Sequence, residues 1–143
     1  RYQPMEKLLL SSLLFGSFVL SACSSGVNDV KPVEAKNIKE VCLKGSIRKA
    51  PDEIVEALTK SLKQKHIAAR LVKKDEGCSH ILHFSVKGNS KIIARSKLKL
   101  RDSNKLSLGS ISYKHRGDEA DRVKQVGLQG QTDLMINELF KNN

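Results

Sequence analysis

The 143-residue chain contains no Trp, and aromatic residues make up only 4% of it. So few large rings leave little material for an extensive core or for an aromatic-lined ligand surface. The sequence also lacks a Gly-rich phosphate loop, a zinc-protease helix motif and a nucleophile elbow. It shows no internal repeat and no low-complexity tract. These absences exclude the enzyme classes that such motifs mark.

The residues that could support catalysis have simpler explanations. Asp52, Glu53 and Glu56 follow a proline at a predicted helix start, where acids suit the positive end of the helix dipole. His115 lies beside Arg116 in a predicted loop, and no Ser or Cys nucleophile can be placed next to it. We therefore expect no catalytic residue, no cofactor and no enzymatic activity, and a hydrolase is an alternative without support.

Long hydrophobic runs are limited to one segment near the start of the chain. Lys7 precedes Leu8 to Leu20, a stretch that is interrupted only by Ser and Gly. The run is too short for a typical membrane-spanning helix, which needs about 20 apolar residues. A thin basic region, an apolar run and small residues are typical of a secretory signal peptide, here residues 1–22. The alternatives are a signal peptide without lipidation, a stable membrane anchor and a buried core helix. Residues 1–4, which precede Met5, are predicted to be non-native.

The signal ends in Leu20-Ser21-Ala22-Cys23, which resembles a bacterial lipobox. This resemblance implies that Cys23 is lipidated and becomes the mature N-terminus, so that the protein contacts the membrane through its lipid. Ser24 stands where an inner-membrane retention signal would have Asp. We therefore expect an outer-membrane lipoprotein whose folded domain faces the periplasm.

The remaining cysteines form an even pair, Cys42 and Cys78. In an oxidising compartment such a pair favours a disulfide. The alternative is a metal site made by Cys78, His80 and His83. On one strand, however, His80 and His83 point to opposite faces, so the disulfide is favoured and no metal site is predicted.

Acidic residues are scarce relative to basic ones: 15 Asp and Glu stand against 26 Lys and Arg, which gives a formal net charge of +11. Such a balance attracts anionic partners over long distances. For an exported protein these are phospholipid headgroups, lipopolysaccharide phosphates and cell-wall polymers, so nucleic acid is not an expected partner. The simpler alternative is that surface Lys residues only keep a small domain soluble.

Residues 23–37 are predicted to form a lipidated N-terminus and flexible tether, and residues 38–143 a single α+β domain. Alternation and helical spacing of apolar residues predict the order β-α-β-β-β-β-α, with an antiparallel twisted sheet and two helices packed on one face. The expected strands are Ile38–Leu43, Ile67–Val72, His80–Lys87, Ile92–Leu100 and Leu106–Tyr113, and the expected helices run from about Ala50 to Lys65 and from about Arg122 to Phe140.

The strand Ile92–Leu100 predicts a basic surface. Its alternation places Ile92, Ala94, Ser96, Leu98 and Leu100 toward the core and basic side chains outward on the open face. With one more cation from the next strand, the candidate anion-binding residues are Arg95, Lys97, Lys99 and Lys114.

Several short segments resemble a family of small uncharacterised proteobacterial outer-membrane lipoproteins. They are Cys78–Phe84, Ala94–Leu100, Gly109–Tyr113 and the closing helix Thr132–Phe140. The family shares a lipobox, an early Cys, a Cys before a long hairpin and a Gly in the last strand. More loosely, the order of elements is similar to that of outer-membrane assembly lipoproteins. These resemblances imply location and architecture, but no activity.

Two functions follow as hypotheses. The first is a non-enzymatic envelope lipoprotein that binds or scaffolds an envelope protein through the open sheet face or a sheet edge. The second is direct binding of anionic envelope polymers, lipopolysaccharide or cell wall, through the basic face. The two differ in salt dependence, because binding through exposed charges weakens as salt rises.

Overall fold

The computed structural model describes residues 26–75, 77–115 and 120–143. The predicted signal peptide and Cys23 lie outside these residues. The elements are, in order, β1 (Val27–Lys31), β2 (Glu40–Ser46), α2 (Ile54–Gln64), β3 (Ala68–Leu71), β4 (His80–Gly88), β5 (Ile93–Asp102), β6 (Ser107–Lys114) and α3 (Ala120–Leu139). The predicted α+β class is confirmed.

The six strands form one sheet in the order β1-β6-β5-β4-β2-β3. The pairs β1–β6, β6–β5 and β5–β4 are antiparallel, but β2 is parallel to both β3 and β4. The expectation of an antiparallel sheet was therefore wrong for the two strand pairs that β2 forms, β2–β3 and β2–β4. The reason is the connection: α2 carries the chain from the end of β2 back to the start of β3, and such a helical crossover joins parallel strands.

The segment predicted as a tether is largely part of the domain. Val27–Lys31 pairs with β6, and Val33 is 1% exposed. The backbone N–H of Val33 donates to the carbonyl of Leu139 at 2.8 Å. A flexible tether over residues 26–37 was therefore wrong. The strand gave no alternating signal because Asp29 has a positive φ of 49° and the register shifts between Asn28 and Lys31.

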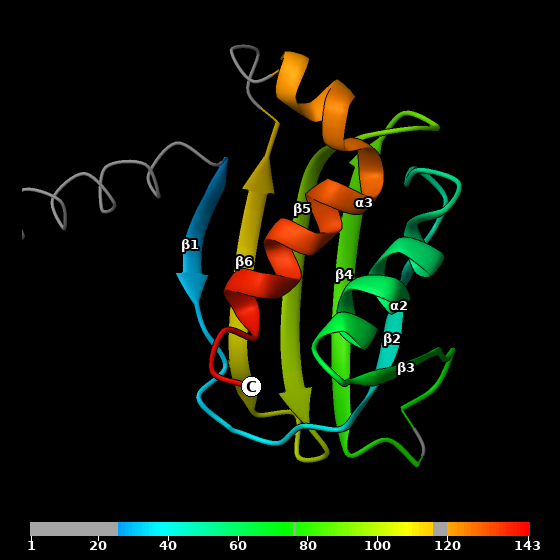
Figure 1. Ribbon diagram of the computed structural model, residues 1–143. Coiled ribbons are helices and arrows are strands. Elements are labelled where there is room, and N and C mark those ends of the chain that lie inside the picture. Colours follow the sequence, from blue (N-terminus) through cyan, green and yellow to red (C-terminus); the bar gives the residue numbers. More distant parts are fainter. Residues whose placement is uncertain (1–25, 76, 116–119) are drawn as a thin grey trace, which may run out of the picture.

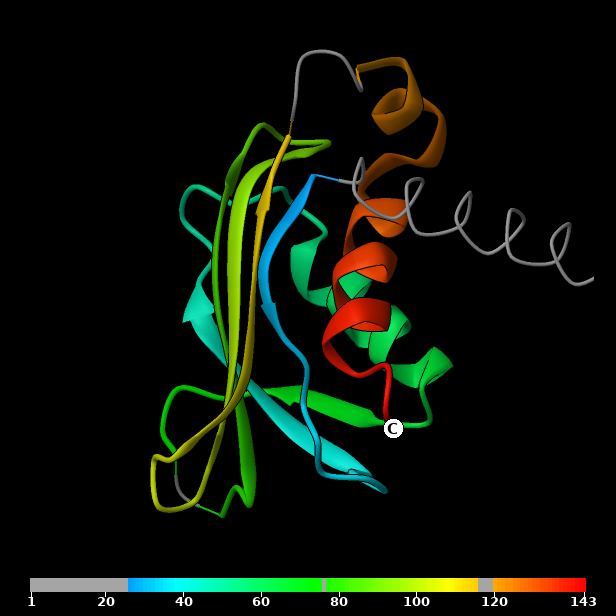
Figure 2. The same ribbon diagram turned by 90° about the vertical axis from the view of Figure 1, so that its left-hand side faces the viewer.

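Both helices cover the same face of the sheet (Figures 1 and 2). Helix α2 buries one stripe made of Ile54, Ala57, Leu58, Ser61 and Leu62. Helix α3 changes direction at Gly127, whose φ of 65° and ψ of −167° are not helical. Its last turns bury Met135, Ile136 and Leu139 against the sheet, and Phe140, directly after the helix, is buried with them. No helix in these described ranges is long and apolar enough to cross a membrane.

Helix α3 also holds the start of β5 through the buried side chain of Gln131. Its amide oxygen accepts the N–H of Ile93 at 2.8 Å, and its amide nitrogen donates to the Ile93 carbonyl at 3.0 Å. The β4–β5 register shifts at this point, so that Ile93 is buried and Ala94 is exposed. The expected inward positions of Ile92 and Ala94 were therefore wrong, whereas Ser96, Leu98 and Leu100 do point inward.

Candidate anion-binding face of the sheet

The face of the sheet opposite the helices carries a regular array of basic side chains, which we call the open face. In Figure 2 no described helix covers this side of the sheet. Arg95, Lys97 and Lys99 alternate along β5 with residues that are buried on the helix side. Lys114 of β6 is the register partner of Arg95. The structure thus brings all four predicted residues onto one face.

Register across the sheet orders the open face in rows. Lys87, Arg95 and Lys114 are direct cross-strand partners and form the first row. Ser85, Lys97 and Ser112 form the second. Since neighbouring strands lie about 4.7–4.9 Å apart, the backbone positions of the three cationic residues of the first row fall within a span of about 10 Å.

Two further rows complete the open face on the other side of Lys97. His83, Lys99 and Ser110 form the third row, and β1 extends it with Lys31. Ile81 and Arg101 lie beyond them as register partners. The candidate residues predicted from the sequence did not include Lys87, because its alignment with Arg95 depends on the β4–β5 register.

Five basic side chains of β4, β5 and β6 are exposed and have no acidic partner among the described residues. Lys87, Arg95, Lys97, Lys99 and Lys114 take part in no ion pair within the described part of the chain. The two ion pairs that are present there, Lys44–Asp75 at 2.5 Å and Arg70–Glu40 at 3.5 Å, involve β2 and β3. None of the three cations of the first row is therefore neutralised by an acidic side chain of the described residues.

This arrangement costs the sheet some stability. Like charges that lie directly opposite each other on neighbouring strands are unfavourable, by up to about 1 kcal/mol per pair. Arg95 has such a partner on each side, Lys87 and Lys114. Solubility alone does not require cations to be placed opposite each other.

Three shallow hollows run in series across the open face. The first is lined by Ser46, Arg48, Lys49, Phe84, Ser85, Val86 and Lys87. The central hollow is lined by Ser85, Lys87, Arg95, Ser96, Lys97, Ser112, Tyr113 and Lys114. The third is lined by Asp29, Lys31, Lys97, Leu98, Lys99, Ser110, Ile111 and Ser112. Neighbouring hollows share residues, so one elongated ligand could follow all three.

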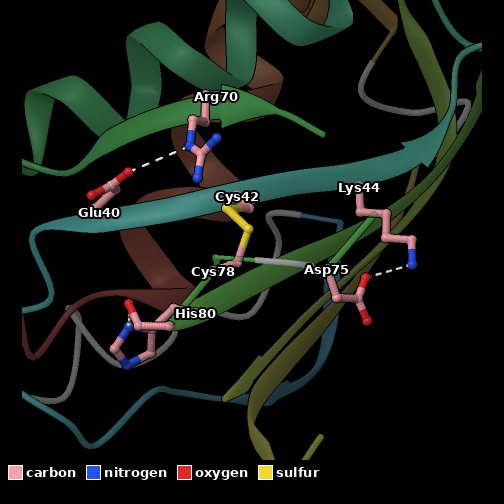
Figure 3. Close-up of a disulfide and its surroundings, with 8 residues drawn as sticks. Glu40, Cys42, Lys44, Arg70, Asp75, Cys78 and His80 are labelled. Carbon is pink, nitrogen blue, oxygen red and sulfur yellow. Dashed lines mark hydrogen bonds and ion pairs between the residues drawn. A yellow bond between two sulfur atoms is a disulfide. The ribbon is translucent and has the colours of Figure 1, made fainter. Parts of the chain in front are cut away.

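A disulfide between Cys42 and Cys78 lies at the β2 side of the open face (Figure 3). The predicted pair is thus present in the structure, with an S–S distance of 2.08 Å. Both cysteines are buried, and they form a small apolar cluster with Ile81 and Val72. The bridge holds the segment before β4 against β2, where Asp75 reaches Lys44.

The alternative metal site does not assemble. The Cys78 sulfur forms the disulfide with Cys42 and is therefore not available to bind a metal. His83 points to the open face, and His80 lies three residues before it in β4, so the two imidazoles do not meet at one ion. Within the described residues, no group of three His, Cys, Asp or Glu side chains could hold an ion.

Two titratable groups respond to the charges on this face. Burial lowers the pKa of His83, and the neighbouring cations Arg101 and Lys44 lower it further. The hydrogen bond from Lys44 lowers the pKa of the Asp75 carboxyl, which lies on the exposed surface. Burial is the main cause of the shift in the pKa of His83, and the cations Arg101 and Lys44 near the third row add to it.

Comparison with solved structures finds an NMR structure of an uncharacterised lipoprotein B from Nitrosomonas europaea. The two chains are 12% identical with a TM-score of 0.38, and the match covers 73% of this chain and 84% of that chain. No protein-family model and no curated protein matches the sequence. A TM-score of 0.38 and 12% identity are too low to carry an argument about fold or function.

Proposed function

We propose that this protein is a non-enzymatic lipoprotein of the bacterial outer membrane that binds anionic envelope polymers through its open face. The lipobox-like Leu20-Ser21-Ala22-Cys23 supports the location. The row Lys87–Arg95–Lys114 carries the binding proposal, because three cations that have no ion-pair partner among the described residues lie side by side on a face that no described helix covers. Phosphate or carboxylate groups of lipopolysaccharide or of the cell wall would neutralise them.

The location has its own test. Wild-type cells should attach labelled fatty acid to the protein, and Cys23→Ser should abolish the labelling. Ser24→Asp should move the protein from the outer-membrane fraction to the inner-membrane fraction. Labelling of the Cys23→Ser protein would refute lipidation at this residue.

Binding is tested with the processed chain carrying Cys23→Ser, purified lipopolysaccharide and purified cell-wall sacculi. Sedimentation should show binding at about 50 mM NaCl that weakens strongly at about 500 mM, because the Debye length shortens as salt rises. Arg95→Glu with Lys97→Glu should abolish binding, because it reverses the charge at the centre of the first row and beside it. The matched control, Lys36→Glu with Lys39→Glu, makes the same charge change in the exposed β1–β2 connection and should bind far better. Equal loss in both variants would mean that only net charge matters, and unchanged binding in the open-face variant would refute the proposal.

A protein partner is the second candidate, and one observation favours it. Ile47 and Leu71 are 58% and 49% exposed, and both line a hollow at the β2–β3 edge of the sheet. Apolar docking there would survive high salt, unlike polymer binding. A crosslinked complex that persists at high salt and disappears in Leu71→Ser would favour this candidate.

A further inference from the structure

The central hollow differs from its neighbours in the sign and spacing of its charges. It holds the complete first row, Lys87, Arg95 and Lys114, together with Lys97. We infer that this hollow is a subsite for a phosphomonoester dianion, so that the open face selects ligands with terminal phosphate over ligands whose anionic group carries one charge, such as a phosphodiester or a carboxylate. The inference rests on the proposed anion binding and adds the chemical class of the ligand.

Charge and shape both favour phosphate. A phosphomonoester carries a charge of about −1.5 to −2 at neutral pH and presents three strong acceptor oxygens. A carboxylate carries one charge and has two oxygens in a plane, which cannot serve three cations on three strands equally well. Arg95, in the middle of the row, can bind two of the phosphate oxygens at once through its planar guanidinium.

Hydroxyl groups add donors beside the cations. Ser85 and Ser112 flank Lys97 on the neighbouring strands and also line the central hollow. Neither the Ser85 nor the Ser112 side chain is engaged in a hydrogen bond in the described part of the protein. Both remain available as donors to a bound oxygen.

The neighbouring hollows suit a dianion less well. The third hollow contains the carboxylate of Asp29, which repels a phosphate. The first hollow has Arg48, Lys49 and Lys87, but none of these residues has a cation directly opposite it on both neighbouring strands, as Arg95 has in the central hollow. The described lining of the central hollow contains four cations and no acid.

The test compares vesicles of equal surface charge with the processed chain carrying Cys23→Ser. One set contains phosphatidic acid, a phosphomonoester, and the other contains phosphatidylglycerol, a phosphodiester with one charge. We expect at least about tenfold tighter binding to the phosphatidic acid vesicles, because charge-assisted hydrogen bonds to a dianion are strong. Soluble phenyl phosphate distinguishes the source: competition by it shows that phosphate alone suffices, whereas its failure to compete shows that the lipid surface is part of the ligand.

Variants separate the subsite from the rest of the face. Arg95→Gln should remove the preference for phosphatidic acid, and Arg95→Lys should restore only part of it because Lys cannot bind two oxygens in one plane. Lys99→Gln, in the third hollow, should weaken binding to both vesicles but keep the preference. Circular dichroism confirms that each variant is folded.

The outcomes distinguish the two proposals. If both vesicle types bind equally and Arg95→Gln weakens both equally, the face binds anions without a phosphate subsite, and this inference is overturned while the proposed function stands. If neither vesicle type binds better than a neutral one, both proposals fail. A preference for phosphatidic acid that survives in Arg95→Gln also overturns the inference.

Discussion

Reduction of the Cys42–Cys78 disulfide should destabilise the domain by an amount that follows from the chain between the two cysteines. The sequence separation is 36 residues, and closing a loop of that size in the unfolded chain contributes about 3–4 kcal/mol in the chain-entropy model. Whole small domains are stable by only about 5–15 kcal/mol, so this is a large share. The folded state should change little, because reduced thiols remain as small buried apolar groups beside Ile81 and Val72.

The assay is urea unfolding of the Cys23→Ser chain with and without reductant, followed by circular dichroism. We expect the free energy of unfolding to fall by about 3–4 kcal/mol and the m-value to rise, because the unfolded chain expands when the loop opens. The control variant Cys42→Ala with Cys78→Ala should be insensitive to reductant. A loss of less than about 1 kcal/mol on reduction would show that the loop does not contribute as this model requires.

Three further predictions concern the core and the open face. Gln131→Leu should lower the free energy of unfolding by about 2–3 kcal/mol in urea titrations, because it leaves the Ile93 N–H and carbonyl without their partners; an unchanged midpoint would contradict this. Gly45→Ala should cost about 1–3 kcal/mol by the same measurement, since a Cβ would lie 2.2 Å from the Phe84 carbonyl oxygen, and wild-type stability would show that β2 shifts freely. Because the folded-state pKa of His83 is lowered, its contribution to stability is present above the unfolded pKa of about 6.5 and is lost as the pH falls through the folded value. In the wild-type protein the free energy of unfolding should therefore decline as the pH falls below about 6.5, and His83→Gln should make this decline less steep. An equally steep decline in both proteins would show that His83 is not its cause.

Helical and alternating patterns predicted the elements that bury one face each. The stripe Ile54, Leu58 and Leu62 gave α2 because these residues recur at helical spacing. The strands β4, β5 and β6 followed from the alternation of apolar and polar residues, which is the normal pattern of a sheet with one solvated face. The same alternation correctly placed Arg95 and Lys97 on the open face.

Such patterns could not predict which strands pair with each other, and they could not detect an irregular strand. The parallel arrangement of β2 depends on which neighbours it finds, and alternation within one strand carries no information on direction. β1 has an irregular register and a burial pattern with only two half-buried residues, so it has no detectable period. The inward position of Ile93 depends on Gln131, which is 38 residues away in the sequence, so the pattern of residues within the strand could not predict it.

Cations lie directly opposite each other on neighbouring strands of the open face, and this placement needs a physical reason. The core requires only the helix-facing side, so packing leaves the residues of the open face unconstrained. If that face served solubility alone, mixed charges would be the more stable choice, because opposite charges across strands attract and like charges repel. The described part of the chain does form ion pairs, Lys44–Asp75 and Arg70–Glu40, and both lie toward the β3 edge. Arg95, between Lys87 and Lys114, is therefore a position where a small loss of stability is tolerated. An Arg95→Thr variant that is more stable but binds anions less well would show that this cost is tied to binding, and one that is neither would remove the reason for assigning a role to the row.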